Sequence, residues 1–119
     1  MIEQSVLAAL KGSPAATSAG DKVYALLLPD GTGYPAVTYQ RISNVPVYSI
    51  LGPSGLDQPR IQVDCWAETY AEAKTLAGEV RTAMEGAGFK GRLITDADDL
   101  DETVGAYRVT MDFYCWQKE

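Results

Sequence analysis

The side chains best suited to chemistry gather in one acidic run of the sequence. Five carboxylates lie close together there: Asp96, Asp98, Asp99, Asp101 and Glu102. Oxygen ligands of this kind could hold a calcium ion. However, Leu100 stands at the position of the third ligand of a calcium loop, no turn glycine follows, and no glutamate closes the loop. Nothing marks a pocket or a carboxyl group with a shifted pKa either. The run therefore predicts a solvated acidic turn, with no metal site and no acid–base pair.

Three glycines, Gly86, Gly88 and Gly91, have the spacing of a dinucleotide-binding fingerprint. That motif must follow a strand and open a helix, so that the helix N-terminus faces the phosphates. Here the glycines follow a predicted helix and precede a predicted strand, and the C-terminal end of a helix dipole repels phosphate. The sequence predicts no bound cofactor.

The chain contains no histidine, the commonest general base and metal ligand near neutral pH. Most hydrolase-type catalytic sites are thereby excluded, and we expect no catalytic residue. The two cysteines, Cys65 and Cys115, lie at apolar positions of predicted strands. We expect buried free thiols. Strand pairing could bring them together, but a reducing compartment would keep them unbonded.

Composition narrows the class of protein. With 119 residues, of which 46% are hydrophobic and 22% charged, the chain reads as one soluble domain covering 1–119. No apolar run approaches the roughly 20 residues that span a bilayer. An acid stands where a secretory signal would carry bases, so we expect a cytoplasmic location without membrane contact. The net charge of −6 disfavours non-specific binding to nucleic acid.

Residues 60–86 organise the predicted fold. Ile61, Val63, Cys65 and Ala67 alternate with polar residues and predict a strand with one apolar face. Thr69 and Glu72 then form a capping box that opens a helix. Its apolar stripe consists of Tyr70, Ala73, Leu76, Ala77, Val80, Ala83 and Met84. We expect this helix to pack on the apolar face of the strand.

The other elements follow from the same periodicities. An amphipathic helix is predicted at 2–11, and strands are predicted near 23–28, 36–48, 59–67, 91–97 and 104–117. The order is α-β-β-β-α-β-β. Short turns between successive strands favour antiparallel pairing, so we predict an α+β fold with an antiparallel or mixed sheet of about four to five strands and helices on one face.

Aromatic and charged residues populate the face of two predicted strands that points away from the central helix. Because aromatics and arginine are enriched in interface cores, this face is a candidate subunit interface. The alternatives are that the N-terminal helix covers it, or that the rings are edge anchors. The stretch 44–59 adds apolar residues that contact a partner or cover the domain's own core. The candidate interface residues are Arg60, Asp64, Trp66, Arg108, Tyr114 and Trp116, with Tyr48, Ile50 and Leu51.

Three stretches together resemble the tail-completion family of long-tailed bacteriophages. They are 35–43 (PAVTYQRIS), 60–73 (RIQVDCWAETYAEA) and 107–113 (YRVTMDF). The middle stretch, a strand ending in Trp66 and Ala67 that runs into an alanine-rich helix, is the most specific of the three. The resemblance covers essentially the whole chain.

The resemblance implies a structural, non-enzymatic virion protein in the neck of the tail, assembled in the host cytoplasm. Such a protein caps the head-proximal end of the tail tube, terminates tail growth and joins the tail to the head connector or stopper protein. It is expected to form a ring with itself, a hexamer, through which DNA passes without sequence-specific binding. An acidic lumen would let DNA slide. Another neck component, a stopper or adaptor, is the alternative within this class, and a small ligand-binding or enzymatic α+β domain is the alternative outside it.

Overall fold

The computed structural model describes residues 2–12, 22–26, 33–49, 52–87, 90–101, 105–115 and 117–118. Only the backbone is described at 2–3, 44–49, 52–58, 101 and 117–118. Among these residues, no helix is both long and apolar enough to cross a membrane.

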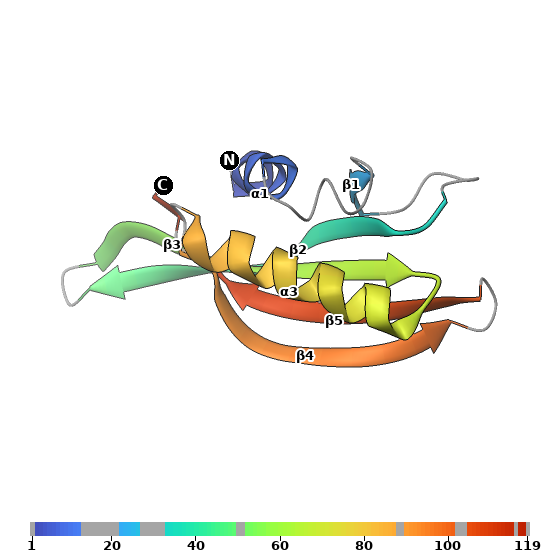
Figure 1. Cartoon of the computed structure of the whole chain (residues 1–119). Helices are drawn as coiled ribbons and strands as arrows, with labels where there is room; N and C mark the ends of the chain where they lie inside the picture. The colour runs from blue at the N-terminus through green and yellow to red at the C-terminus, as the bar shows by residue number, and fades with distance from the viewer. Residues whose placement is uncertain are drawn as a thin grey trace.

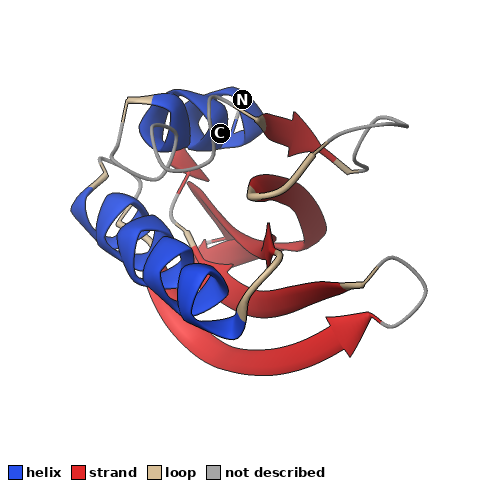
Figure 2. Ribbon diagram, turned by 45° about the vertical axis from the view of Figure 1, so that its right-hand side comes forward, coloured by secondary structure: helices blue, strands red, loops and turns tan. Residues whose placement is uncertain are grey.

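The elements follow one another in the predicted order α-β-β-β-α-β-β, with a short additional strand at the end (Figure 1). They are α1 (Ile2–Lys11), β1 (Val23–Ala25), β2 (Ala36–Ser49), β3 (Gly52–Ala67), α3 (Tyr70–Gly86), β4 (Arg92–Asp101), β5 (Ala106–Tyr114) and β6 (Gln117–Lys118). Both helices lie on one side of a curved sheet (Figure 2). The predicted α+β class is thereby confirmed.

The sheet is mixed, as the sequence allowed. Its strand order is β1-β2-β3-β5-β4, and β6 pairs separately with β3. β1 runs parallel to β2, whereas the other pairs are antiparallel. In the centre, Val63 lies opposite Tyr39 of β2 and Met111 of β5. This register brings the apolar positions of three strands to the same face.

That face and the two helices enclose the core. Ile61, Val63, Cys65 and Ala67 of β3 are all 0% exposed, as their alternation predicts. From the helices, the core takes Val6 and Leu10 of α1 and Ala73, Leu76, Ala77, Val80 and Met84 of α3. The start of α3 is also confirmed, because the Thr69 hydroxyl accepts a hydrogen bond from the Glu72 backbone N–H at 3.2 Å.

Tyr70, the first residue of the apolar stripe predicted for this helix, does not belong to the core. Tyr70 is 47% exposed, and its hydroxyl donates to the carboxylate of Asp98 in β4 instead of packing in the core. A tyrosine can occupy a buried apolar position through its ring or an exposed position through its polar hydroxyl. Because Tyr70 lies in the first turn of the helix, at the margin of the sheet, it takes the exposed position.

As far as Asp101, the acidic run is a strand and not the predicted turn, and Glu102 lies outside the described residues. Asp98 lies opposite Val109 and Asp99 opposite Arg108. Aspartate has low strand propensity, but residues 95–101 pair with β5, and tertiary pairing overrides propensity. In contrast, β1 is shorter than predicted. Leu26 has φ of 67°, which turns the chain out of the strand direction.

The stretch after residue 43 forms a long hairpin. β2 and β3 pair as far as Ser49 and Gly52, and the hairpin extends past α3 in Figure 1. The two cysteines are buried and free, as predicted. The Cys115 N–H bonds the Pro59 carbonyl at 2.9 Å, and Cys65 lies further along β3 by about 20 Å at a rise of about 3.3 Å per residue. Strand pairing therefore separates the thiols.

Gly91 provides a test of how α3 meets β4. A Cβ atom there would lie 2.7 Å from the Met84 carbonyl oxygen, which is backbone and cannot swing aside. We expect Gly91→Ala to lower the free energy of unfolding by about 1–3 kcal/mol in urea denaturation. Gly78→Ala is the matched control, since its Cβ would meet nothing within 4 Å and alanine favours a helix interior by about 1 kcal/mol. A neutral Gly91→Ala would contradict this close packing.

Candidate functional site

The strand register gathers most of the predicted interface residues on one surface. We call this surface the open face: the side of the sheet opposite the two described helices. In the register, Arg60 lies opposite Tyr114, Asp64 opposite Thr110, and Trp66 opposite Arg108. The open face as described comprises Thr38, Gln40, Arg60, Gln62, Asp64, Trp66, Arg108, Thr110, Asp112 and Tyr114.

Trp66 is held in place by three neighbours. Its indole N–H donates to the Thr38 hydroxyl at 3.3 Å. The Tyr34 ring stacks on it, with centroids 6.3 Å apart and planes inclined by 25°. The guanidinium carbon of Arg108 lies 5.3 Å from the ring centroid, in cation–π range. The indole therefore occupies a fixed position while remaining only half-buried, as an anchor residue of an interface would.

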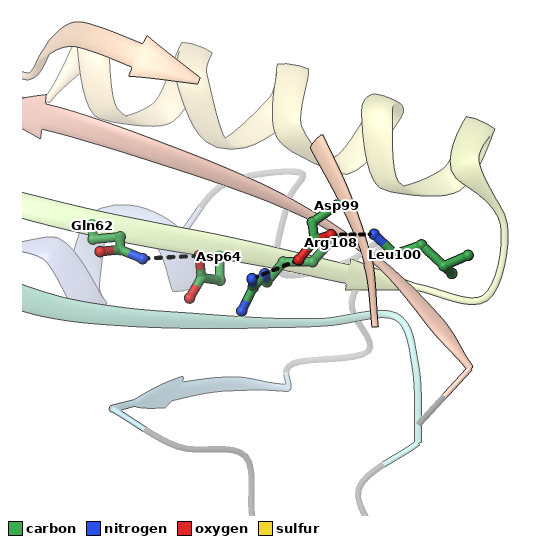
Figure 3. A network of polar contacts seen from close by, with 5 residues as sticks. All are labelled: Gln62, Asp64, Asp99, Leu100 and Arg108. Atoms are coloured by element: carbon green, nitrogen blue, oxygen red, sulfur yellow. Dashed lines mark hydrogen bonds and ion pairs between the residues drawn. The ribbon is translucent and has the colours of Figure 1, made fainter. Parts of the chain in front are cut away.

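Arg108 also reaches across to the neighbouring strand. Its guanidinium donates to Asp99 at 2.9 Å, and the other oxygen of Asp99 accepts the Leu100 backbone N–H (Figure 3). Nearby, the Gln62 amide donates to Asp64 at 3.3 Å (Figure 3). Asp99 thus contributes to the open face, although the sequence predicted that it lies in a solvated turn.

A second ion pair lies at the other end of the open face. Arg60 donates to Asp112 at 2.6 Å, and the Asp112 side chain is only 13% exposed. The hydrogen bond to Asp112, followed by the charge of Asp112, raises the pKa of Arg60 above its ordinary value. Within the described residues, Asp112 Oδ1, Arg60 Nε and Arg108 Nε are buried without a hydrogen-bond partner. Arg60 and Arg108 are nevertheless each paired with an aspartate of the chain.

The opposite side of β4 is tied to α3 by polar contacts. The Tyr70 hydroxyl donates to Asp98 at 2.5 Å, and the Lys74 ammonium donates to the same carboxylate at 3.3 Å. The hydrogen bond from Tyr70, and then that from Lys74, lower the pKa of Asp98 below its ordinary value. The same contacts raise the pKa values of Tyr70 and Lys74.

No arrangement suited to catalysis was found in the described part of the chain. It contains no group of three or more His, Cys, Asp or Glu placed to hold a metal. The neighbouring Asp98 and Asp99 of β4 point to opposite sides of the sheet. A cavity of about 460 Å³ near the start of α3 is lined by Pro35, Ala71, Glu72, Thr75 and Leu76. Of the described residues that line it, only Glu72 carries a carboxylate.

The remaining predicted residues are not tested by this geometry. Ile50, Leu51 and Trp116 lie outside the described residues, and Tyr48 is described only by its backbone, which pairs with Pro53 in the hairpin. Sequence reasoning missed two contributors to the open face. Tyr34 lies before the strand predicted at 36–48 and was given no role, and Asp99 was placed in a solvated turn. If 95–99 had been predicted as a strand, the alternation of side chains along it would have placed Asp99 on the open face.

Comparison with known proteins gives a match over nearly the whole chain. The sequence model of the family described as "Tail completion protein gp17" matches residues 4–118. A search among curated proteins found no match. Among solved structures, a chain of the "Virion of native gene transfer agent (GTA) particle" is similar, with a TM-score of 0.72 and 18% sequence identity over 96% of this chain and 92% of that chain. At this identity the structural match shows the shared fold.

The contact between Tyr70 and Asp98 predicts a pH dependence. Because the pKa of Asp98 is lowered on folding, the contact adds stability above the ordinary aspartate pKa of about 3.9, and this stability is lost as the pH falls through the folded value. The raised pKa values of Tyr70 and Lys74 add stability below about pH 10 that is lost as the pH rises further.

We expect Tyr70→Phe to move the pKa of Asp98 up toward its ordinary value, because the largest cause of the shift is removed. An NMR titration of the Asp98 carboxyl carbon measures this. Lys74→Met is the companion variant and should produce a smaller rise. An unchanged pKa in Tyr70→Phe would show that the hydroxyl does not hold Asp98.

Proposed function

The chain belongs to the tail completion protein family, and from this premise we propose that it caps the head-proximal end of a tail tube, terminates tail growth and joins the tail to the head connector. It is a tail completion protein of a phage-like virion and, as predicted, a structural protein and not an enzyme. The observation that carries the proposal is the family match from residue 4 to residue 118, which covers nearly the whole chain.

We assign the contact with other virion proteins to the open face. Trp66, Arg108 and Tyr114 are residue types enriched in interface cores. The contacts of Trp66 with Thr38 and Tyr34 fix its ring before any partner binds, which reduces the entropy lost on association. The prediction from the sequence that Trp116 contributes to the interface is retained as a proposal, and Trp116 lies outside the described residues. The hairpin that carries Tyr48, Ile50 and Leu51 is a second proposed contact.

The proposed partners are further copies of the chain in a ring, a hexamer, together with the tail tube protein and the head connector or stopper protein. DNA would pass through the ring without sequence-specific binding. The charge pattern supports this, because Arg60 and Arg108 are engaged by Asp112 and Asp99 and the chain carries a net charge of −6. Paired arginines and an acidic surface give phosphates little to bind. A ring channel lined with unpaired Lys and Arg would contradict this point.

Deleting the gene from the particle's genome tests the proposed function. We expect filled heads separated from tails, and tails of irregular length, in electron micrographs of the lysate. Expression of the intact protein from a plasmid should restore particles with tails of uniform length. Unjoined tails of normal, uniform length would instead assign the protein to another neck component such as a stopper or adaptor.

Trp66→Ala tests the assignment of the open face. We expect a folded protein, because the ring lies outside the core, that fails to complement the gene deletion or yields tails of irregular length. Thermal unfolding followed by circular dichroism checks the fold, and micrographs of complemented lysates check the tails. Trp66→Phe should restore part of the function, and Thr82→Ala on the exposed side of α3 should behave as the unsubstituted protein. If Trp66→Ala unfolds the isolated protein, the indole belongs to the core and the assignment is wrong.

A further inference from the structure

One row of side chains crosses the open face and links Trp66 to the acidic strand β4. Trp66 of β3 lies opposite Arg108 of β5, and Arg108 lies opposite Asp99 of β4. Residues opposite each other on neighbouring antiparallel strands share a face and lie within contact distance. Asp99 is two strands away from Trp66, or about 10 Å at a spacing of about 4.8 Å between strands. Asp99 therefore reaches the indole through Arg108 and not directly.

The guanidinium of Arg108 contacts both neighbours at once. Its carbon lies 5.3 Å from the centroid of the indole ring, and its Nη2 donates to Asp99 at 2.9 Å. Attraction to an aromatic ring is weak at a partly exposed site, and an arginine loses many rotamers when it is held in one position. A charge-assisted hydrogen bond is stronger and directional. Within the described residues, Asp99 is the only acceptor for Arg108, whose buried Nε has no partner.

Asp99 is itself fixed by its own strand. Oδ1 of its carboxylate accepts the Leu100 backbone N–H at 2.9 Å, and Oδ2 accepts from Arg108 (Figure 3). The neighbouring Asp98 points to the other side of the sheet, where α3 holds it. Because aspartate is an unfavourable residue in a strand, strand formation gains nothing from Asp99. Arg108, in contrast, gains an acceptor in a fixed position.

The other contacts of Trp66 restrain the ring from one side of β3 only. The Thr38 hydroxyl of β2 accepts from the indole N–H at 3.3 Å, longer than the about 2.9–3.0 Å typical of such bonds. Tyr34, which precedes β2, stacks with its centroid 6.3 Å away, near the far end of the range of about 4.5–7 Å for aromatic pairs. Arg108 lies on the other neighbour of β3. It therefore supplies the restraint from the opposite side.

We propose that Asp99 is a positioning residue of the open face: it holds the Arg108 guanidinium beside the indole and thereby keeps Trp66 in the orientation in which the ring meets a partner. This rests on the proposed function in one respect, namely that Trp66 contacts another virion protein. Without Asp99, the indole remains on the open face but changes orientation more freely. A ring that must be ordered on binding weakens the contact, because ordering costs entropy.

NMR of the isolated protein tests the positioning without any partner. The indole N–H of Trp66 gives a nitrogen–proton signal, which is identified by its disappearance in Trp66→Phe. We expect Asp99→Ala to displace this signal and to lower its heteronuclear NOE, because the ring gains fast motion. Asp98→Ala is the matched control, since it removes the same charge from the adjacent residue on the other side of the sheet. It should leave the indole signal in place.

Arg108→Met tests whether Asp99 acts through the guanidinium, because it removes the charge and the donors and keeps a long side chain. We expect it to displace the indole signal at least as far as Asp99→Ala does. Asp99→Ala should then add nothing in the double variant. The Asp99 side chain is 58% exposed, so we expect a folded variant, and Asp99→Asn takes its place if circular dichroism shows otherwise.

Three results would overturn the positioning role. The first is an indole signal that Asp99→Ala leaves unmoved. The second is an equal displacement in Asp98→Ala, which would show a general loosening of β4. The third is a further displacement when Asp99→Ala is added to Arg108→Met, which would show that Asp99 acts by another route.

Complementation of the gene deletion separates this proposal from the proposed function. At equal amounts of folded protein, we expect Asp99→Ala to give fewer joined tails of uniform length than the unsubstituted protein. If the indole signal moves but Asp99→Ala and Trp66→Ala both complement fully, the positioning is correct and the assignment of Trp66 to a contact is wrong. If Trp66→Ala fails to complement and Asp99→Ala complements fully, the contact does not need the positioning and the proposal is wrong.

Discussion

The register of β3 between β2 and β5 is the constraint on which the rest of the molecule depends. A strand alternates its side chains between two faces, so a slip by one residue would exchange them all. In the observed register, four β3 side chains are fully buried under the helices, each large apolar one contributing about 1.5–3 kcal/mol. The slipped register would bury Arg60, Asp64 and Trp66 instead. The apolar face thereby fixes the composition of the open face, although no helix of the described structure touches it.

Different interactions stabilise the two faces of the sheet. Beneath α1 and α3, close packing of aliphatic side chains holds the sheet. On the open face, charged side chains neutralise one another: Arg60 with Asp112, and Arg108 with Asp99. β4 makes polar contacts on both sides of the sheet, because Asp99 faces Arg108 while Asp98 is held by Tyr70 and Lys74 of α3. A surface with its charges already paired loses less on desolvation than one with isolated charges, which suits a face that is to be buried in an assembly.

The proposed function assigns the contacts of this tail completion protein with other components of the virion to the open face and the hairpin. The open face offers a fixed aromatic ring among compensated charges, which suits a partner of different sequence.

The sequence by itself determined the order of elements, the buried face of β3, the α3 stripe from Ala73 onward and the cap at Thr69, because these depend on the period of apolar residues and on local hydrogen bonds. It also carried the family resemblance. Only the tertiary structure decided that 98–101 continue the strand, that Tyr70 leaves the core for Asp98, and that Tyr34 and Asp99 join Trp66 and Arg108. Each of these depends on a partner distant in sequence. β5 supplies the backbone groups that the aspartates pair with, and no local pattern encodes the position of such a partner.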